Sequence, residues 1–164
     1  MDPGLKILTS AQNKECDTCT AVAEGMNSHD LMDRATIRIF QHLQNQIPKN
    51  IPICCLCGPG NNGADGLCLS ILFATQGYEV ETKICLLGKR PSTELEFRMN
   101  LYASQTQINM QVIQQVDELN LNKNSLIIDA LFGTGLSAPL QNEWESLIHA
   151  INSQHRPIIS LDMP

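Results

Sequence analysis

Polar and glycine residues that could bind a ligand occur at three points in the chain, each at or directly after an apolar run. The segment Cys54 to Leu67, CCLCGPGNNGADGL, changes from apolar residues to glycines and two asparagines. Asp129 and Asp162 lie near the ends of two later apolar runs. Carboxylate and amide oxygens suit a hard cation rather than zinc, and two close carboxylates can have separated pKa values and transfer protons. The sequence therefore predicts a polar site with cation-binding or acid–base chemistry.

The segment Gly58–Gly63 also matches G-x-G-x-x-G, so an oxidoreductase that binds NAD(P) is one alternative. Asp65 is expected at the start of the following helix, where its carboxylate would cap the helix and repel a pyrophosphate. Asn61 and Asn62 add donors and acceptors that pyrophosphate binding does not require. Gly88-Lys-Arg90, after the next apolar run, could fit a 2′-phosphate. The plain structural alternative is a turn with a helix cap.

The other two segments also have a functional and a structural interpretation. A carboxylate within the apolar run around Asp129 is costly unless it is paired or bound to a cation, which favours a function. Gly133-Thr-Gly135 could hold phosphate with its amides or form an ordinary turn. Asp162 could act in catalysis or cap the end of its strand.

The elements that would position these residues alternate between short apolar runs and longer helical segments, which is typical of a parallel sheet with crossover helices. Helices are expected over 9–23, 28–48, 64–75, 91–106 and 142–153, and strands over 51–57, 80–87, 110–116, 125–131 and 157–162. This order predicts an α/β fold, a three-layer α-β-α sandwich with a Rossmann-like, mainly parallel sheet. Ligands collect beyond the carboxyl ends of such strands, where the loops 58–65, 133–139 and 162–164 would lie.

Composition excludes several classes of protein. A length of 164 residues suits one domain, and a net charge of −6 argues against nucleic acid or an anionic membrane as the main partner. The chain shows neither a signal-peptide pattern nor an apolar stretch of spanning length, so a soluble cytoplasmic protein is expected.

The seven cysteines suit a reducing compartment, because most lie in apolar runs. The spacing of Cys16-x-x-Cys19 and Cys54-x-x-Cys57 formally allows a zinc site. Residues i and i+3 of a strand point to opposite faces, however, so the second pair is disfavoured as metal ligands.

Five segments together resemble the YjeF N-terminal domain family, the NAD(P)H-hydrate epimerases. They are Leu8-Thr-Ser-Ala-Gln12, Leu31-Met-Asp-Arg-Ala35, GPGNNGADG, IIDALFGTGL and SLDMP. The last three occur in the family's order and are specific in combination. The resemblance covers nearly the whole chain.

The resemblance implies an isomerase of nicotinamide cofactor repair, which interconverts the R and S forms of hydrated NADH or NADPH for a separate dehydratase. It also implies that Asn62 and Asp129 bind a potassium ion, and it allows a homodimer. As catalytic residues we expect Asp162, which would assist proton transfer, and Asp129, which would hold the charge of the site together with the cation. The implied substrate contacts are Asn61, Asn62, Gly63, Ala64, Asp65, Gly133, Thr134, Gly135, Leu136, Ser137, Ala138, Pro139 and Asp162.

The chain departs from the family pattern at three points. Ala64 and Thr36 stand where the family commonly has glycine. The family motif continues from Asp-x-Pro into Ser-Gly, whereas this chain ends at Pro164. Residues 1–164 are therefore expected to be a single YjeF N-terminal-like domain that lacks the usual C-terminal part, including a serine of the potassium shell. That expectation keeps a non-catalytic binding or scaffold module open as the rival function, ahead of the oxidoreductase.

Overall fold

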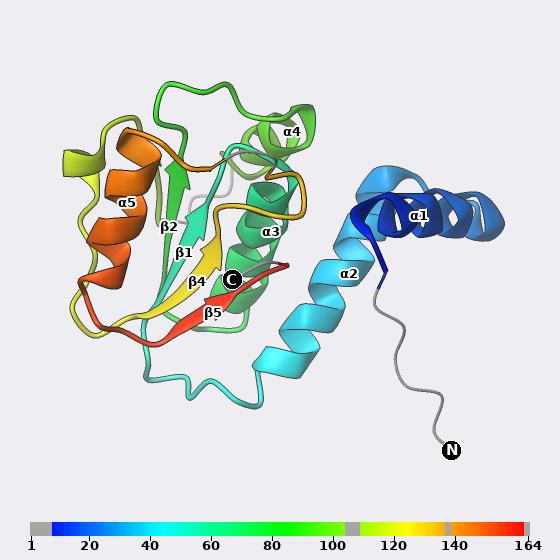
Figure 1. Cartoon of the computed structure of the whole chain (residues 1–164). Helices are drawn as coiled ribbons and strands as arrows, with labels where there is room; N and C mark the ends of the chain where they lie inside the picture. The colour runs from blue at the N-terminus through cyan, green and yellow to red at the C-terminus, as the bar shows by residue number, and fades with distance from the viewer. Residues whose placement is uncertain (1–7, 104–108, 137–138, 163–164) are drawn as a thin grey trace, which may run out of the picture.

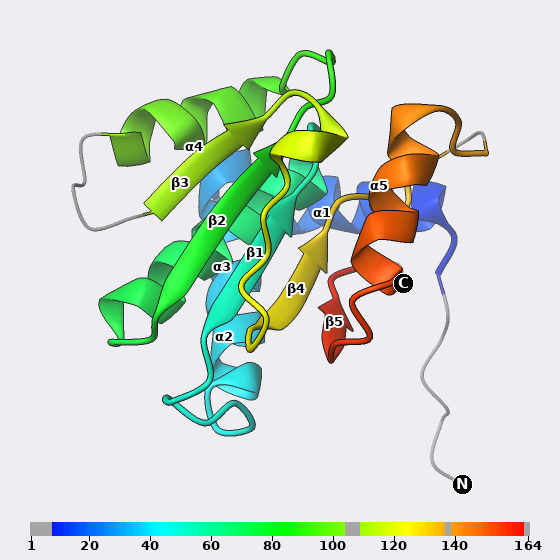
Figure 2. The same ribbon diagram turned by 90° about the vertical axis from the view of Figure 1, so that its left-hand side faces the viewer.

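A computed structural model describes residues 8–103, 109–136 and 139–162. Five parallel strands form one sheet in the order β3-β2-β1-β4-β5; Figure 1 shows β2, β1, β4 and β5 side by side, and Figure 2 shows all five. The strands are β1 Ile53–Cys57, β2 Val80–Cys85, β3 Asn109–Ile113, β4 Leu126–Ala130 and β5 Ile158–Ser160. The helices are α1 Ser10–Glu24, α2 Ser28–Leu43, α3 Asn61–Thr75, α4 Thr93–Ala103 and α5 Glu143–Asn152, with a short 3₁₀ turn at Val116–Glu118.

Strand β1 is buried on both faces, and its alternating side chains divide the core in two. Cys55 and Cys57 pack with apolar residues of α2, α3 and α4. Cys54 and Leu56 pack on the opposite face with α5. Figure 1 shows α3 and α5 on the two sides of the sheet. The predicted three-layer α-β-α sandwich and its Rossmann-like parallel sheet are confirmed.

The two N-terminal helices each begin at a capping box. Thr9 and Gln12 form a capping box at α1, and Asn27 and Asp30 form one at α2. Helix α2 joins the core through Phe40 and Leu43, whereas α1 is largely exposed and lies outside the three layers (Figure 1).

Two helix starts differ from the sequence prediction. Helix α3 begins at Asn61 rather than Ala64, with Gly60 as its N-cap residue, so Asp65 lies inside the helix and does not cap it. Helix α4 begins at Thr93 rather than at residue 91, and the Ser92 hydroxyl accepts a hydrogen bond of 3.2 Å from the Leu95 amide.

The cysteines provide no zinc site. Cys54 and Cys57 lie in opposite halves of the core, and Cys16 and Cys19 are exposed on α1. Within the described ranges, no three His, Cys, Asp or Glu side chains are grouped to hold a metal. None of the helices described is long and apolar enough to cross a membrane.

Candidate active site

The site begins where β1 passes into α3 through a tightly packed glycine segment. A Cβ on Gly63 would lie 1.8 Å from the carbonyl oxygen of Gly58, and a Cβ on Gly58 would lie 1.8 Å from that of Leu131. These contacts leave no room for a side chain, so β1, α3 and the end of β4 are held together through bare backbone. Gly60 makes no side-chain cap, and the first turn of α3 contains no acidic residue. Its uncapped amides favour an anion.

Asn62, in the first turn of α3, joins this segment to the two other loops. Its Nδ2 donates to the Phe132 carbonyl oxygen at 2.7 Å and to the Leu161 carbonyl oxygen at 3.2 Å. Asn62 of the first predicted loop therefore binds the residues directly before the other two. Because the nitrogen makes both bonds, Oδ1 is left as the acceptor atom of this side chain.

Asp162 lies directly against the second glycine loop. Its Oδ2 accepts a hydrogen bond of 2.8 Å from the Thr134 amide. A Cβ on Gly133 would lie 2.4 Å from the same oxygen and 3.3 Å from the Cβ of Asn62. Asp162 has a left-handed backbone, with φ of 69°. This is uncommon for a residue other than glycine, and it coincides with the carboxylate that we expected to be catalytic.

Asp129 approaches the same loop from the other face of the sheet. Its neighbours in register are Leu56 and Ser160, and Leu56 faces α5. The carboxylate accepts from the Leu131 amide at 3.0 Å and weakly from the Ser160 hydroxyl at 3.5 Å. Burial raises the pKa of Asp129, and these two hydrogen bonds oppose the rise. No hydrogen bond connects Asp129 with Asn62 or Asp162, all three being described residues.

Two cavities border the loop that contains Phe132, Gly133 and Thr134. One, of about 740 Å³, contains Asn62, Asp65 and Asp162. The other, of about 860 Å³, is lined by Asp129 and Ser160 together with apolar residues that include Ile148 and Ile151 of α5 and Ile158 of β5. Phe132, Gly133 and Thr134 line both. The first cavity has the polar groups and the size of a small-molecule site.

Asp65 is a half-buried carboxyl in the wall of the first cavity. Burial, followed by the nearby carboxylates of Asp162 and Glu94, raises the pKa of Asp65 to about 7. Near neutral pH it is therefore partly protonated, and its repulsion of an anion is weaker than we expected from the sequence.

The predicted contact residues differ in their access to this cavity. Gly63 and Ala64 are buried and do not line it, and neither does Pro139. Ser137 and Ala138 lie outside the described residues. The predicted residues that line the cavity are Asn61, Asn62, Asp65, Gly133, Thr134, Gly135, Leu136 and Asp162.

Further residues that were not among the substrate contacts implied by the family resemblance also line the cavity. They include Asn13, Lys14 and Asp17 on α1, Lys89 after β2, and Trp144 on α5. A signal existed for Lys89, because Gly88-Lys-Arg90 follows β2 at the carboxyl edge of the sheet. No local pattern indicates that α1 reaches the cavity.

Comparison with known proteins shows the family to which the chain belongs. The chain is 30% identical to the NAD(P)H-hydrate epimerase of Limosilactobacillus fermentum, over 96% of this chain and 73% of that protein. It is 34% identical to the bifunctional NAD(P)H-hydrate repair enzyme Nnr of Coxiella burnetii, over 88% of this chain and 29% of that protein. The crystal structure of yeast ynu0 has the same fold, with a TM-score of 0.75 at 24% identity, covering 98% of this chain and 71% of the yeast chain. A family model described as YjeF-related protein N-terminus matches residues 28–164, and the chain therefore belongs to this family.

Proposed function

We propose that the protein is an NAD(P)H-hydrate epimerase, an isomerase that interconverts the R and S forms of hydrated NADH and NADPH. The observation that carries this proposal is the placement of Asp162 against Gly133 and Thr134, in the cavity that the first turn of α3 also lines. The relatives named as epimerases support the reaction, and those named as bifunctional repair enzymes support a functional link to a dehydratase. A small hydrated cofactor also suits a cavity of about 740 Å³.

Epimerisation requires that a bond to the hydrated ring carbon breaks and forms again, with proton transfer at its oxygen. We assign that transfer to the Asp162 carboxylate. The Thr134 amide fixes Oδ2 of this carboxylate, and Gly133 leaves the space beside it free of a side chain. A carboxylate that is already oriented does not need to be ordered when the substrate reacts.

Asn62 and Asp129 are the proposed ligands of a potassium ion. Their chemistry fits, because Oδ1 of Asn62 is left as an acceptor and the Asp129 carboxylate makes only one strong hydrogen bond. The ion would supply a fixed positive charge beside the site. Asp129, the second proposed catalytic residue, would balance this charge rather than transfer a proton.

The remaining proposed contacts would bind the hydrated dinucleotide around these carboxylates. Asn61, Asn62, Asp65 and the loop from Gly133 to Leu136 do so from the cavity wall. Gly63 and Ala64 act through the backbone packing that places the wall. A homodimer and a cytoplasmic location stay predictions, and the first is tested by the mass measured in solution by light scattering.

The deciding experiment follows purified R-hydrate by chiral chromatography. Wild-type protein should convert it toward a mixture of epimers far faster than buffer alone. Asp162→Asn keeps the size of the side chain and should lose about a hundredfold or more in kcat, within the usual range for loss of a proton-transfer group. Full activity of this variant would refute the role of Asp162, and an inactive wild type would argue for the scaffold alternative.

Two further experiments test the oxidoreductase alternative and the proposed potassium site. If the oxidoreductase alternative held, plain NADPH would raise the melting temperature as much as its hydrate does. Replacing potassium by sodium at constant ionic strength should lower the activity of the wild type. In Asp129→Asn the same exchange should have little effect, because one proposed ligand has lost its charge.

A further inference from the structure

Lys89 lies in a tight turn at the carboxyl edge of the sheet, directly after β2. Gly88 has a left-handed backbone, with φ of 75°, and its amide donates to Oε1 of Gln114. The Lys89 amide donates to the Leu86 carbonyl oxygen at 2.9 Å. The backbone of this turn is therefore fixed, and Lys89 lines the same cavity as Asn62 and Asp162.

The side chain of Lys89 has an aromatic partner. Its Nζ lies 5.9 Å from the centre of the Trp144 ring, within the range of a cation–π interaction. Trp144 is 8% exposed and packs edge to face against Phe132, with ring centres 5.1 Å apart. Both aromatic residues also line the cavity. The ammonium group is thus held at the cavity wall by a rigid aromatic pair and forms no ion pair with any described carboxylate.

The charged side chains around the cavity would disfavour an anionic ligand unless a cationic side chain also contacts it. Three carboxyl groups line it, those of Asp17, Asp65 and Asp162, against two lysines, Lys14 and Lys89, among the described residues. Hydrated NADH carries a doubly charged pyrophosphate, and hydrated NADPH carries a 2′-phosphate in addition. A phosphate in this setting needs a cationic side chain, and lysine is a common choice.

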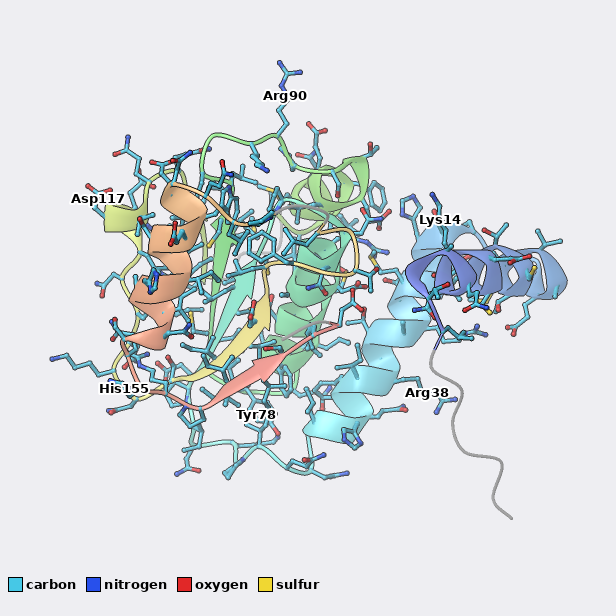
Figure 3. All side chains as sticks on the ribbon, in the orientation of Figure 1. Lys14, Arg38, Tyr78, Arg90, Asp117 and His155 are labelled. Atoms are coloured by element: carbon cyan, nitrogen blue, oxygen red, sulfur yellow. The ribbon has the colours of Figure 1, made fainter. Side chains whose placement is uncertain are left out.

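Arg90 provides a natural contrast to Lys89. It follows Lys89 directly, yet it does not line the cavity and extends away from the body of the molecule (Figure 3). Neighbouring residues with the same charge thus differ in their access to the site. Comparing substitutions of these two residues therefore distinguishes a specific contact with phosphate from a general electrostatic attraction.

We propose that Lys89 binds a phosphate group of the dinucleotide. The proposal rests on the proposed function for the identity of the substrate. Phosphate recognition is common to hydrated NADH and hydrated NADPH, and the two differ in the 2′-phosphate. Comparing both substrates therefore shows which phosphate Lys89 contacts.

The test uses Lys89→Gln, which keeps most of the stem over Trp144 and removes the charge, with Arg90→Gln as the matched control. Lys89→Gln should raise KM about tenfold and change kcat less than about twofold, whereas Arg90→Gln should change either by less than about twofold. Lys89→Arg should restore most of the affinity. A rise in KM for hydrated NADPH alone assigns the 2′-phosphate, and an equal rise for both substrates assigns the pyrophosphate. Equal effects of Lys89→Gln and Arg90→Gln overturn the proposal.

A second measurement does not depend on turnover. Calorimetry with ADP and with adenosine 2′,5′-bisphosphate should show weaker binding to Lys89→Gln than to Arg90→Gln for at least one of the two nucleotides. If wild-type protein binds them in this Lys89-dependent way but does not epimerise the hydrates, the proposed function fails and the phosphate site stands. If it epimerises the hydrates but neither nucleotide binding nor KM depends on Lys89, the function stands and the role of Lys89 fails.

Discussion

The two glycine-rich segments of the site look alike in sequence but differ in what their glycines contact. In the segment after β1, the Cβ positions of Gly58 and Gly63 are occupied by backbone carbonyl groups. In the segment after β4, the Cβ position of Gly133 is occupied by the Asp162 carboxylate, and that of Gly135 has no neighbour within 4 Å. The first segment joins the layers of the fold, and the second makes room for a reactive group. Substitutions in the two should therefore affect different properties.

The largest effect is expected from Gly63→Ala. Alanine is favoured over glycine inside a helix by about 1 kcal/mol, but a Cβ at 1.8 Å from the Gly58 oxygen forces α3 away from β1. We expect the clash to dominate and to lower the free energy of unfolding by about 3 kcal/mol or more. Urea unfolding measures the change. Gly60→Ala, which meets nothing within 4 Å, is the control and should cost less than about 1 kcal/mol. Equal losses in the two variants would show that the backbone contact is unimportant.

Gly133→Ala should have the opposite effect, with a small change in stability and a large loss of activity. Its Cβ would meet a side-chain oxygen that can move, so the melting temperature should change little, while displacement of Asp162 should lower kcat by about a hundredfold. Hydrate turnover and thermal unfolding measure the two effects on the same sample. Gly135→Ala adds a methyl group to the same loop without a contact. The fold loss in kcat should be at least about tenfold smaller in this variant than in Gly133→Ala. A collapse in stability with Gly133→Ala would remove the distinction between the two segments.

Asp65→Asn should have the smallest effect, and one that depends on pH. The native pKa of Asp65 is raised from 3.8 to about 7, so the folded state binds a proton that the unfolded state releases between these values. The contribution of Asp65 to the free energy of unfolding therefore falls as the pH rises from about 4 to about 7. The asparagine side chain has no charge, and the variant should be more stable than wild type by about 1–2 kcal/mol at pH 8 and nearly equal at pH 4.

Urea unfolding of both proteins at the two pH values checks this expectation. A stability difference that did not change with pH would mean that Asp65 titrates normally. The segment after β1 would then carry a full negative charge at Asp65 near neutral pH.

The sequence predicted the order of elements and the three loops because apolar periodicity and glycine positions are local properties. It did not predict the start of α3, because Asn61, Asn62 and Gly63 are weak helix formers whose conformation depends on packing against Gly58. The sequence also did not show which face of β4 carries Asp129. The pleat of β4 places this side chain on the face of α5, so it lines a different cavity from Asn62. Assigning a side chain to one face requires the strand register, which local sequence patterns leave open.

Some cysteines are exposed and others are buried, so thiol labelling can report how often the core opens. Cys16 and Cys19 are exposed on α1, whereas Cys54, Cys55, Cys57, Cys68 and Cys85 are buried. A thiol reagent should therefore label two sites at once. The other five become accessible only as the helices on the two faces separate from the central sheet. Their labelling rate in native buffer follows the population of that opened state, so the stability of the core can be measured without denaturant and without an introduced cysteine.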